Sequence, residues 1–277
     1  MTIKDILVHL DNKKSSPARL QAAINLAKAN DASLTGIYVK TKPYLPAYAE
    51  VQISAQILEQ EAEKLEQQTE QAAELFAKAT GGNGLKAEWR VAEGDVPEVI
   101  AEQARYFDLA VVGQSDPDES IFVGDREMPD RMIMTSGRPA MVIPYAGEYN
   151  AIGKHVLIAW DASPMAARAV HDAMPFLEEA EKVTVMVINP KDVETDTGEL
   201  PGADIAAHLS HHGVNAIADH VVSEMDPGDI LLSRAADLGV DLIVMGAYGH
   251  ARWAELILGG VTNHMLNHMT VPVLMSH

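Results

Sequence analysis

The chain contains no cysteine and comparatively few basic side chains. Because none of its 277 residues is cysteine, disulfide frameworks, iron–sulfur clusters and thiol catalysis are excluded. This composition suits a reducing compartment, so we expect a cytoplasmic protein. The 40 acidic residues outnumber the 21 lysines and arginines, giving a formal net charge of −19. Such a surface repels nucleic acid and anionic membranes, and we expect neither as a partner.

Long apolar runs and common catalytic motifs are also absent. No stretch approaches the roughly eighteen apolar residues that indicate a membrane-spanning helix. The N-terminal apolar run is short and lies between Asp5 and Asp11, which predicts a strand rather than a signal peptide. There is no nucleophile elbow, no P-loop and no defensible carboxylate pair. A binding role is therefore favoured over a catalytic one.

Short apolar runs alternate with helical patterns along the first half. Residues 6–11 are predicted to form a strand, and Ser16 and Pro17 then begin a helix, with Ser16 as its cap. The further elements are strands at 32–39, 88–91, 109–113 and 139–144 and helices at 18–29, about 49–80 and 95–105. This alternation predicts an α/β fold with an open, mostly parallel sheet and helices on both faces.

The second half repeats this plan. Residues 155–164 repeat the strand, Asp, Ser-Pro and helix of residues 6–17, and later segments correspond in the same order. A repeat of this length indicates two copies of one domain, which we place at residues 1–148 and 152–277. An apolar edge left exposed on a last strand such as 271–275 would invite aggregation, which supports pairing of the two sheets within the chain. Pairing of whole chains into a homodimer is left open.

The stretch from Asp241 to Pro272 is rich in spaced glycines. An apolar run at 242–245 is followed by Gly246, Gly249, Gly259 and Gly260. Glycine allows a backbone to approach a phosphate closely, and the first amides of a helix have no intrahelical partner. Single glycines also serve turns and close packing, but the whole spaced set favours phosphate binding.

This glycine pattern, G-x-x-G, nine residues, then G and a small residue, resembles the nucleotide loop of the universal stress protein family. The resemblance covers nearly the whole chain as a tandem pair. It implies a Rossmann-like fold related to adenine nucleotide hydrolases. It also implies ATP or another adenine nucleotide, with or without Mg²⁺, bound by a stress-response sensor or binding module. In ATP-binding members the small residue is usually Ser or Thr, whereas here it is Gly260, so a hydroxyl for the terminal phosphate is missing.

The resemblance and the strand ends together define a candidate nucleotide site. Asp161 matches an Asp near the adenosine, where a carboxylate accepts from ribose hydroxyls or the adenine amino group. Alternatively, it caps the helix that begins near Ser163. The residues His250 and Arg252 either reach the phosphates or remain solvated. An Arg guanidinium suits contact with phosphate better than a His imidazole. The full set is Asp161, Ala162, Val187, Ile188, Met245, Gly246, Gly249, His250, Arg252, Gly259, Gly260, Val261 and Thr262.

The first half lacks this pattern and is predicted to be a degenerate copy. Gly113 is followed by the acidic segment 114–119, and Gly124 is followed by Asp125. Residues 130–132, Asp-Arg-Met, stand where the phosphate-facing turn is expected. Carboxylates here repel a triphosphate unless a metal intervenes, so we predict that this half binds no nucleotide.

Two histidine pairs have helical spacing, His208 with His212 and His264 with His268. Each pair shares a helix face, but no third ligand is evident, so surface faces are favoured and no metal site is predicted. Three alternative functions stay open. The first is a slow metal-dependent ATP hydrolase that uses Asp161. The second is a nucleotide-independent interaction or scaffold protein. The third is a carrier of a hydrophobic small ligand in the first half of the chain.

Overall fold

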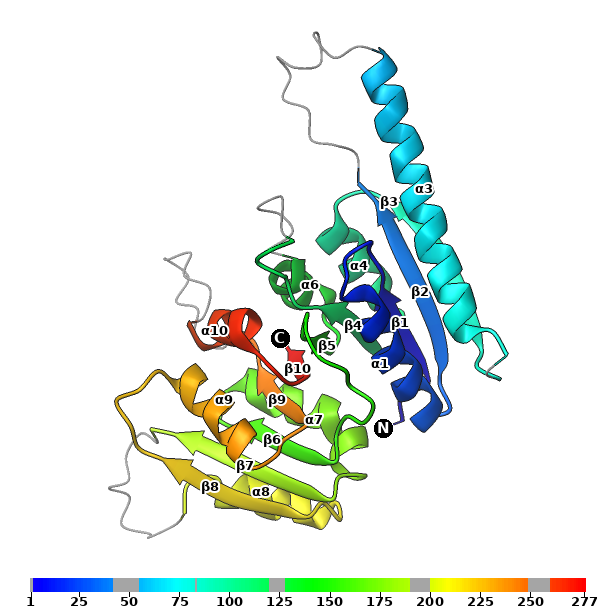
Figure 1. Ribbon diagram of the computed structural model, residues 1–277. Helices are drawn as coiled ribbons and strands as arrows, with labels where there is room; N and C mark the ends of the chain where they lie inside the picture. The colour runs from blue at the N-terminus through cyan, green and yellow to red at the C-terminus, as the bar shows by residue number, and fades with distance from the viewer. Residues whose placement is uncertain (1, 42–54, 83, 120–127, 190–199, 249–259) are drawn as a thin grey trace.

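The computed structural model describes residues 2–41, 55–82, 84–119, 128–189, 200–248 and 260–277 (Figure 1). The strands of the N-terminal half are β1 (Asp5–His9), β2 (Ser33–Lys40), β3 (Ala87–Glu93), β4 (Leu109–Gly113) and β5 (Ala140–Ile143). Those of the C-terminal half are β6 (His155–Ala159), β7 (Lys182–Ile188), β8 (Ala216–Val221), β9 (Leu242–Gly246) and β10 (Val273–Ser276).

These strands form one ten-stranded sheet in the order β3-β2-β1-β4-β5-β10-β9-β6-β7-β8. All pairings within each half are parallel. The two halves meet where β10 pairs with β5 in antiparallel register, with Val273 opposite Val142. Both junction strands are buried throughout, so the pairing covers two apolar edges. The expected intrachain pairing is confirmed, and it merges the two predicted sheets into one.

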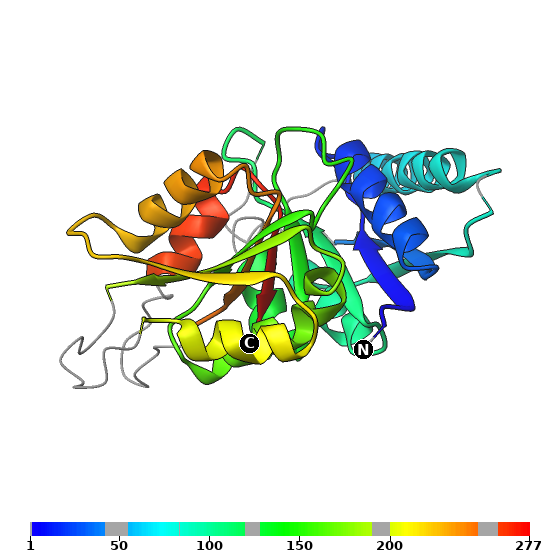
Figure 2. The same cartoon turned by 90° about the horizontal axis from the view of Figure 1, so that it is seen from below.

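Helices cover both faces of this sheet. One face carries α1 (Ser16–Ala29), α3 (Ala55–Thr80), α7 (Pro164–Leu177) and α8 (Ala203–His211). The other carries α4 (Val96–Ala104), α6 (Met128–Ser136), α9 (Pro227–Asp237) and α10 (Gly260–His268). Figure 2 shows α9 and α10 on one side of the C-terminal strands and α8 on the other. Among the described residues we find no helix with the length and hydropathy of a membrane span.

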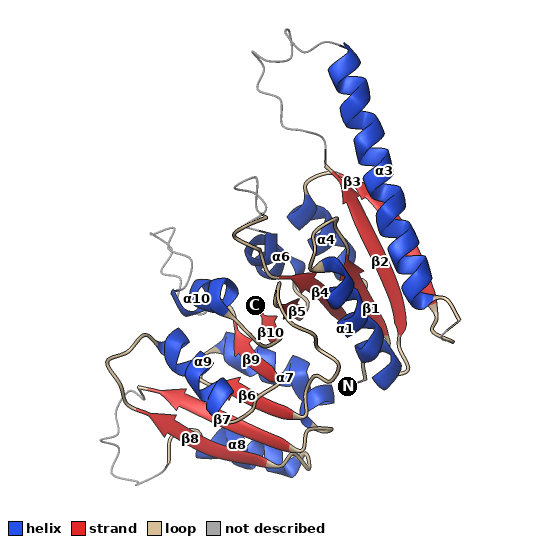
Figure 3. Ribbon diagram, viewed as in Figure 1, coloured by secondary structure: helices blue, strands red, loops and turns tan. Residues whose placement is uncertain are grey.

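The predicted α/β class and the doubled plan are confirmed, and Figure 3 shows the two halves joined at the middle of the sheet. One helix cap was assigned wrongly. The N-cap of α1 is Ser15, whereas the Ser16 hydroxyl donates to the Asp11 carboxylate at 2.7 Å. The sequence analysis also missed β8, an edge strand whose residues are exposed or only partly buried, because such a strand has no continuous apolar run.

Candidate functional site

The candidate site lies at the carboxyl edge of β6 and β9, which are parallel neighbours with Ala159 opposite Met245. The chain leaves β6 for β7 on one side, and β9 lies on the other. The strand order therefore switches between β6 and β9, the place where open α/β sheets bind ligands. Asp161 and Ala162 follow β6, and Ala247 and Tyr248 follow β9, so the fold brings these two segments to one edge.

Asp161 and Ser163 form a tight turn before α7. An Asp161 carboxylate oxygen accepts from the Ser163 backbone N–H at 3.0 Å, and the Ser163 hydroxyl oxygen accepts from the Ala166 N–H at 3.1 Å. The formal helix cap is thus Ser163, while Asp161 supports the turn and stays exposed. Ala162 between them has a φ of 58°, which costs an L-residue about 1–3 kcal/mol and is typical of functional sites.

The two described glycines of the predicted loop differ in their surroundings. A Cβ added to Gly246 would lie 2.5 Å from the backbone nitrogen of Ala166. Gly246 therefore allows the first turn of α7 to pack against the end of β9. Among the described residues, nothing lies within 4 Å of a Cβ added to Gly260, the first residue of α10. The predicted loop residues Gly249, His250, Arg252 and Gly259 lie outside the described residues.

Thr262 joins α10 to the end of β9. It is buried, and its hydroxyl oxygen accepts from the Tyr248 backbone N–H at 3.3 Å. The neighbouring Val261 packs partly buried against the core. The contact between Thr262 and Tyr248 places the first turn of α10 beside β9. Two helix N-termini, those of α7 and α10, therefore lie next to the end of one strand.

Tyr248 anchors this edge to the N-terminal half. Its hydroxyl donates to the buried carboxylate of Asp130 on α6. Burial, with a further contribution from Asp130, holds the pKa of the Tyr248 hydroxyl far above its ordinary value. The backbone of Tyr248 is left-handed, with a φ of 60°. Sequence reasoning missed this residue, because its partner lies in the other half of the chain.

Three predicted residues form the apolar surroundings of the site. Val187 and Ile188 end β7, where Val187 is buried and Ile188 partly buried. The next residue, Asn189, holds the ends of β7 and β8 together, since its side chain both donates to and accepts from the Ser223 backbone. Met245 is 4 % exposed and belongs to the core. Met245 therefore packs in the core beneath the strand ends and does not line the surface of the site.

The matching edge of the N-terminal half is filled by a buried side chain. Asp11 and Gly113 correspond to Asp161 and Gly246 in the repeat. Arg19, which is 3 % exposed, places its Nη2 2.9 Å from an Asp11 carboxylate oxygen. A Cβ added to Gly113 would collide with Nη1 of Arg19. The guanidinium thus packs directly against the end of β4.

The charges at this edge are set by burial and by Arg19. Burial lowers the pKa of His9 to about 4, so its imidazole is neutral at pH 7. Burial alone would raise the pKa of Asp11, but the Arg19 guanidinium and its other neighbours more than offset this and hold it below the usual range. The result is a neutral imidazole beside a buried ion pair.

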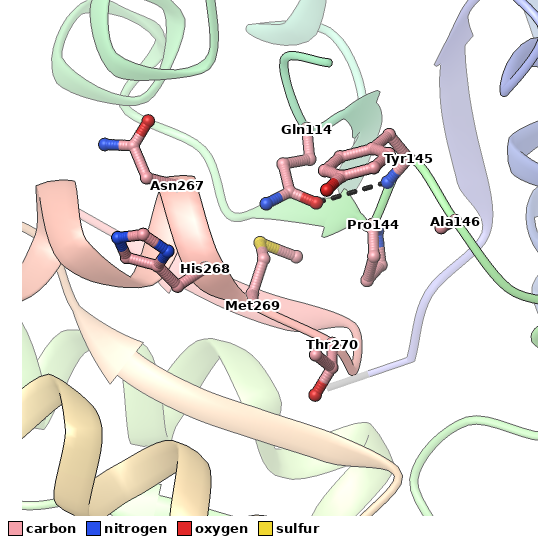
Figure 4. A pocket seen from close by; sticks show the side chains of 8 residues that line it. All are labelled: Gln114, Pro144, Tyr145, Ala146, Asn267, His268, Met269 and Thr270. Carbon is pink, nitrogen blue, oxygen red and sulfur yellow. Dashed lines mark hydrogen bonds between the residues drawn. The ribbon is translucent and has the colours of Figure 1, made fainter. Parts of the chain in front are cut away.

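A pocket of about 230 Å³ lies between the halves and is separate from the candidate site (Figure 4). It is lined by Gln114, Pro144, Tyr145, Ala146, Asn267, His268, Met269 and Thr270. The Gln114 side-chain oxygen accepts from the Tyr145 N–H at 3.2 Å. Its buried amide nitrogen has no hydrogen-bond partner among the described residues, and an ordered water is the ordinary solution for such a group. The pocket adjoins the C-terminal end of α10, whereas Gly260 begins that helix. The pocket therefore does not mark the predicted nucleotide site.

Comparison with known proteins agrees with this two-fold plan. A family model of the universal stress protein family matches residues 2–136 and again residues 153–277. The chain belongs to the universal stress protein family. The matched segments follow the order of the two predicted domains, whose boundaries at 148 and 152 stay a prediction. No curated protein matches the chain.

Solved structures share the fold of this universal stress protein along its whole length. A universal stress protein from Archaeoglobus fulgidus DSM 4304 has 18 % sequence identity and a TM-score of 0.75, covering 99 % of this chain and 96 % of that chain. A functionally unknown protein from Pseudomonas aeruginosa PAO1 has 16 % identity and a TM-score of 0.58, covering 99 % of this chain and 92 % of that chain. At these identities the likeness establishes the fold alone.

Proposed function

We propose that the C-terminal half binds an adenine nucleotide, ATP, ADP or AMP, and that the chain acts in the cytoplasm as a stress-response sensor or binding module. The observation that carries this proposal is the convergence of two helix N-termini on the end of β9. Gly246 contacts the first turn of α7, and Tyr248 contacts Thr262 in the first turn of α10. Unpaired helix amides and the positive end of the helix dipole favour an anion at such a place.

Each described residue then has a stated role. The α10 amides from Gly260 onward bind phosphate, and no described atom lies within 4 Å of a Cβ added to Gly260. Asp161, exposed after β6, accepts hydrogen bonds from the ribose or the adenine amino group. Val187 and Ile188 flank the adenine ring. Arg252 and His250, which lie outside the described residues, are assigned the role of supplying positive charge to the phosphates, and Mg²⁺ accompanies the nucleotide.

The N-terminal half binds no nucleotide in this proposal. Its equivalent edge is filled by Arg19, and the carboxylate of Asp11 is already paired with that guanidinium at 2.9 Å. A nucleotide would have to separate this partly buried ion pair and leave the guanidinium of Arg19, which is 3 % exposed, without its carboxylate. The chain should therefore bind one nucleotide.

Mass spectrometry of the ligand released on denaturation tests the proposal. Protein purified without added nucleotide should release an adenine nucleotide in at most one equivalent per chain. The Asp161→Ala variant, which removes an exposed carboxylate, should release less while keeping its fold by circular dichroism. A different ligand, in equal amounts from both proteins, would contradict the proposal.

A further inference from the structure

A second group of polar side chains lies where α9 packs beside α10. Asp226 is the N-cap of α9, Asp229 lies in its first turn, and His264 comes from α10. One ligand atom from each residue lies within 4.8 Å of the other two. The His264 Nε2 is 3.0 Å from an Asp229 carboxylate oxygen, and its Nδ1 is 3.7 Å from one of Asp226. Two carboxylates therefore flank one imidazole.

The direction of the imidazole does not suit a simple hydrogen bond. His264 Nε2 is covered from solvent and has no hydrogen-bond partner within the part of the chain that the structure describes, although Asp229 is only 3.0 Å away. The carboxylate oxygen therefore lies off the axis along which a ring N–H would donate. Two ligand atoms of one metal ion lie side by side in the same way. Each is directed at the ion, at a distance of about 2.0–2.2 Å, and not at the other ligand atom.

Gly228 adapts α9 to this ring. A Cβ added to Gly228 would lie 2.5 Å from Cδ2 of His264 and 2.8 Å from Cγ. Glycine at this position thus leaves room for the imidazole against the first turn of α9. The position of His264 is set by close packing and is not that of a free surface side chain. The His264 side chain is 22 % exposed, so it is partly buried.

The N-terminal half contains the same arrangement with a different third group. Asp95 is the N-cap of α4, Glu98 lies in the first turn, and the third residue is Arg131 on α6. Arg131 Nη2 lies 2.9 Å from Asp95 and 3.1 Å from Glu98. Arg131 and His264 are equivalent, since each stands eight residues before the proline that precedes the last strand of its half.

The two halves therefore differ in how the carboxylate pair is neutralised. A guanidinium is always charged in proteins, so Arg131 compensates Asp95 and Glu98. An imidazole carries no permanent charge near neutral pH and is a common metal ligand. In the C-terminal half, the arrangement keeps both carboxylates but replaces the permanent cation by a metal-ligating side chain.

We propose that Asp226, Asp229 and His264 bind a divalent transition-metal ion such as Zn²⁺ or Mn²⁺. One imidazole and two carboxylates form a nitrogen and oxygen donor set that suits these ions, and three protein ligands leave coordination positions for water. The ion supplies the positive charge that Arg131 supplies in the other half. This site shares no residue with the proposed nucleotide site and stands independently of it. Sequence analysis missed it because the carboxylates come from a different helix.

Titration of the full chain with Co²⁺ and Zn²⁺, after chelator treatment and desalting, tests this proposal. Visible absorption should reveal one bound Co²⁺ that Zn²⁺ displaces. His264→Arg copies the N-terminal arrangement, so it should retain the thermal unfolding midpoint but bind at least tenfold more weakly. Asp229→Asn removes a second ligand with little change in shape and should also bind at least tenfold more weakly.

His155→Ala is the matched control, because it removes an imidazole that lies 3.9 Å from a single carboxylate, Glu181. It should bind cobalt as the unaltered chain does. Absence of a bound equivalent at millimolar Co²⁺ overturns the proposal. Unchanged Co²⁺ affinity in Asp229→Asn and in folded His264→Arg also overturns it. A loss of Co²⁺ affinity in His155→Ala equal to that in the site variants does the same, since either result indicates general binding to the acidic surface.

Discussion

Arg19 and Gly113 lie in direct contact at the carboxyl edge of the N-terminal strands. The nearest atom to a Cβ built on Gly113 is Nη1 of Arg19, and the same guanidinium pairs with Asp11. At the equivalent Gly246, the contact is the backbone of α7 at Met165 and Ala166. One edge is therefore filled by the buried guanidinium of Arg19 paired with Asp11, whereas the other keeps the exposed carboxylate of Asp161.

This contact predicts a large effect for a small substitution. Gly113→Ala places a methyl group on the guanidinium of Arg19, which must shift away from Asp11. We expect the free energy of unfolding to fall by about 1–3 kcal/mol, as for other overpacked sites. Gly260→Ala is the control, because its Cβ meets no described residue within 4 Å. Urea denaturation measures both, and equal midpoints would contradict the tight contact.

Tyr248→Phe tests the hydrogen bond that joins the halves. The substitution removes the hydroxyl that donates to Asp130 and leaves this buried carboxylate without that donor. We expect a loss of about 1–3 kcal/mol in the free energy of unfolding. Tyr106→Phe removes the same hydroxyl from a side chain that is 80 % exposed and should change stability by less than about 0.5 kcal/mol. Similar thermal midpoints for the two variants would refute the role of Tyr248.

Burial of His9 leads us to expect that the free energy of unfolding depends on pH in the weakly acidic range. Its pKa falls from an ordinary 6.5 to about 4 on burial, so the unfolded chain binds more protons between these values. Stability is thus lost as the pH falls from about 6.5 toward 4, by on the order of 3 kcal/mol in total. Urea denaturation across this window should show a flatter dependence for His9→Gln. An unchanged slope in that variant would assign the effect to other groups.

Periodicity and repetition predicted much of the fold. Buried parallel strands such as Leu242–Gly246 have continuous apolar runs, and Ser163-Pro164 marks the start of a helix, so both are visible in the sequence. The resemblance to universal stress proteins implied that the halves pair through last strands such as 271–275, and the apolar edge of that strand supported it. The edge strand β8 was missed because its residues alternate without a clear apolar pattern.

The candidate site was only partly predictable. Strand order brings Asp161 and Gly246 to one edge, as the sequence indicates, but the packing role of Gly246 depends on how closely α7 approaches. The contact of Tyr248 with Asp130 depends on how the halves meet. The grouping of His264 with Asp226 and Asp229 likewise depends on which helices are neighbours. Residue spacing in the sequence does not predict such contacts between distant segments.

The most direct test of the account is calorimetric titration of the full chain with ATP and Mg²⁺. Gly260→Glu introduces a carboxylate at the start of α10, where no described atom lies within 4 Å of an added Cβ. Asn267→Glu adds the same charge at an exposed position near the other end of the helix. The account predicts one ATP per chain, binding lost in Gly260→Glu and kept in Asn267→Glu. Absence of binding at millimolar ATP, or undiminished binding in Gly260→Glu, would contradict it.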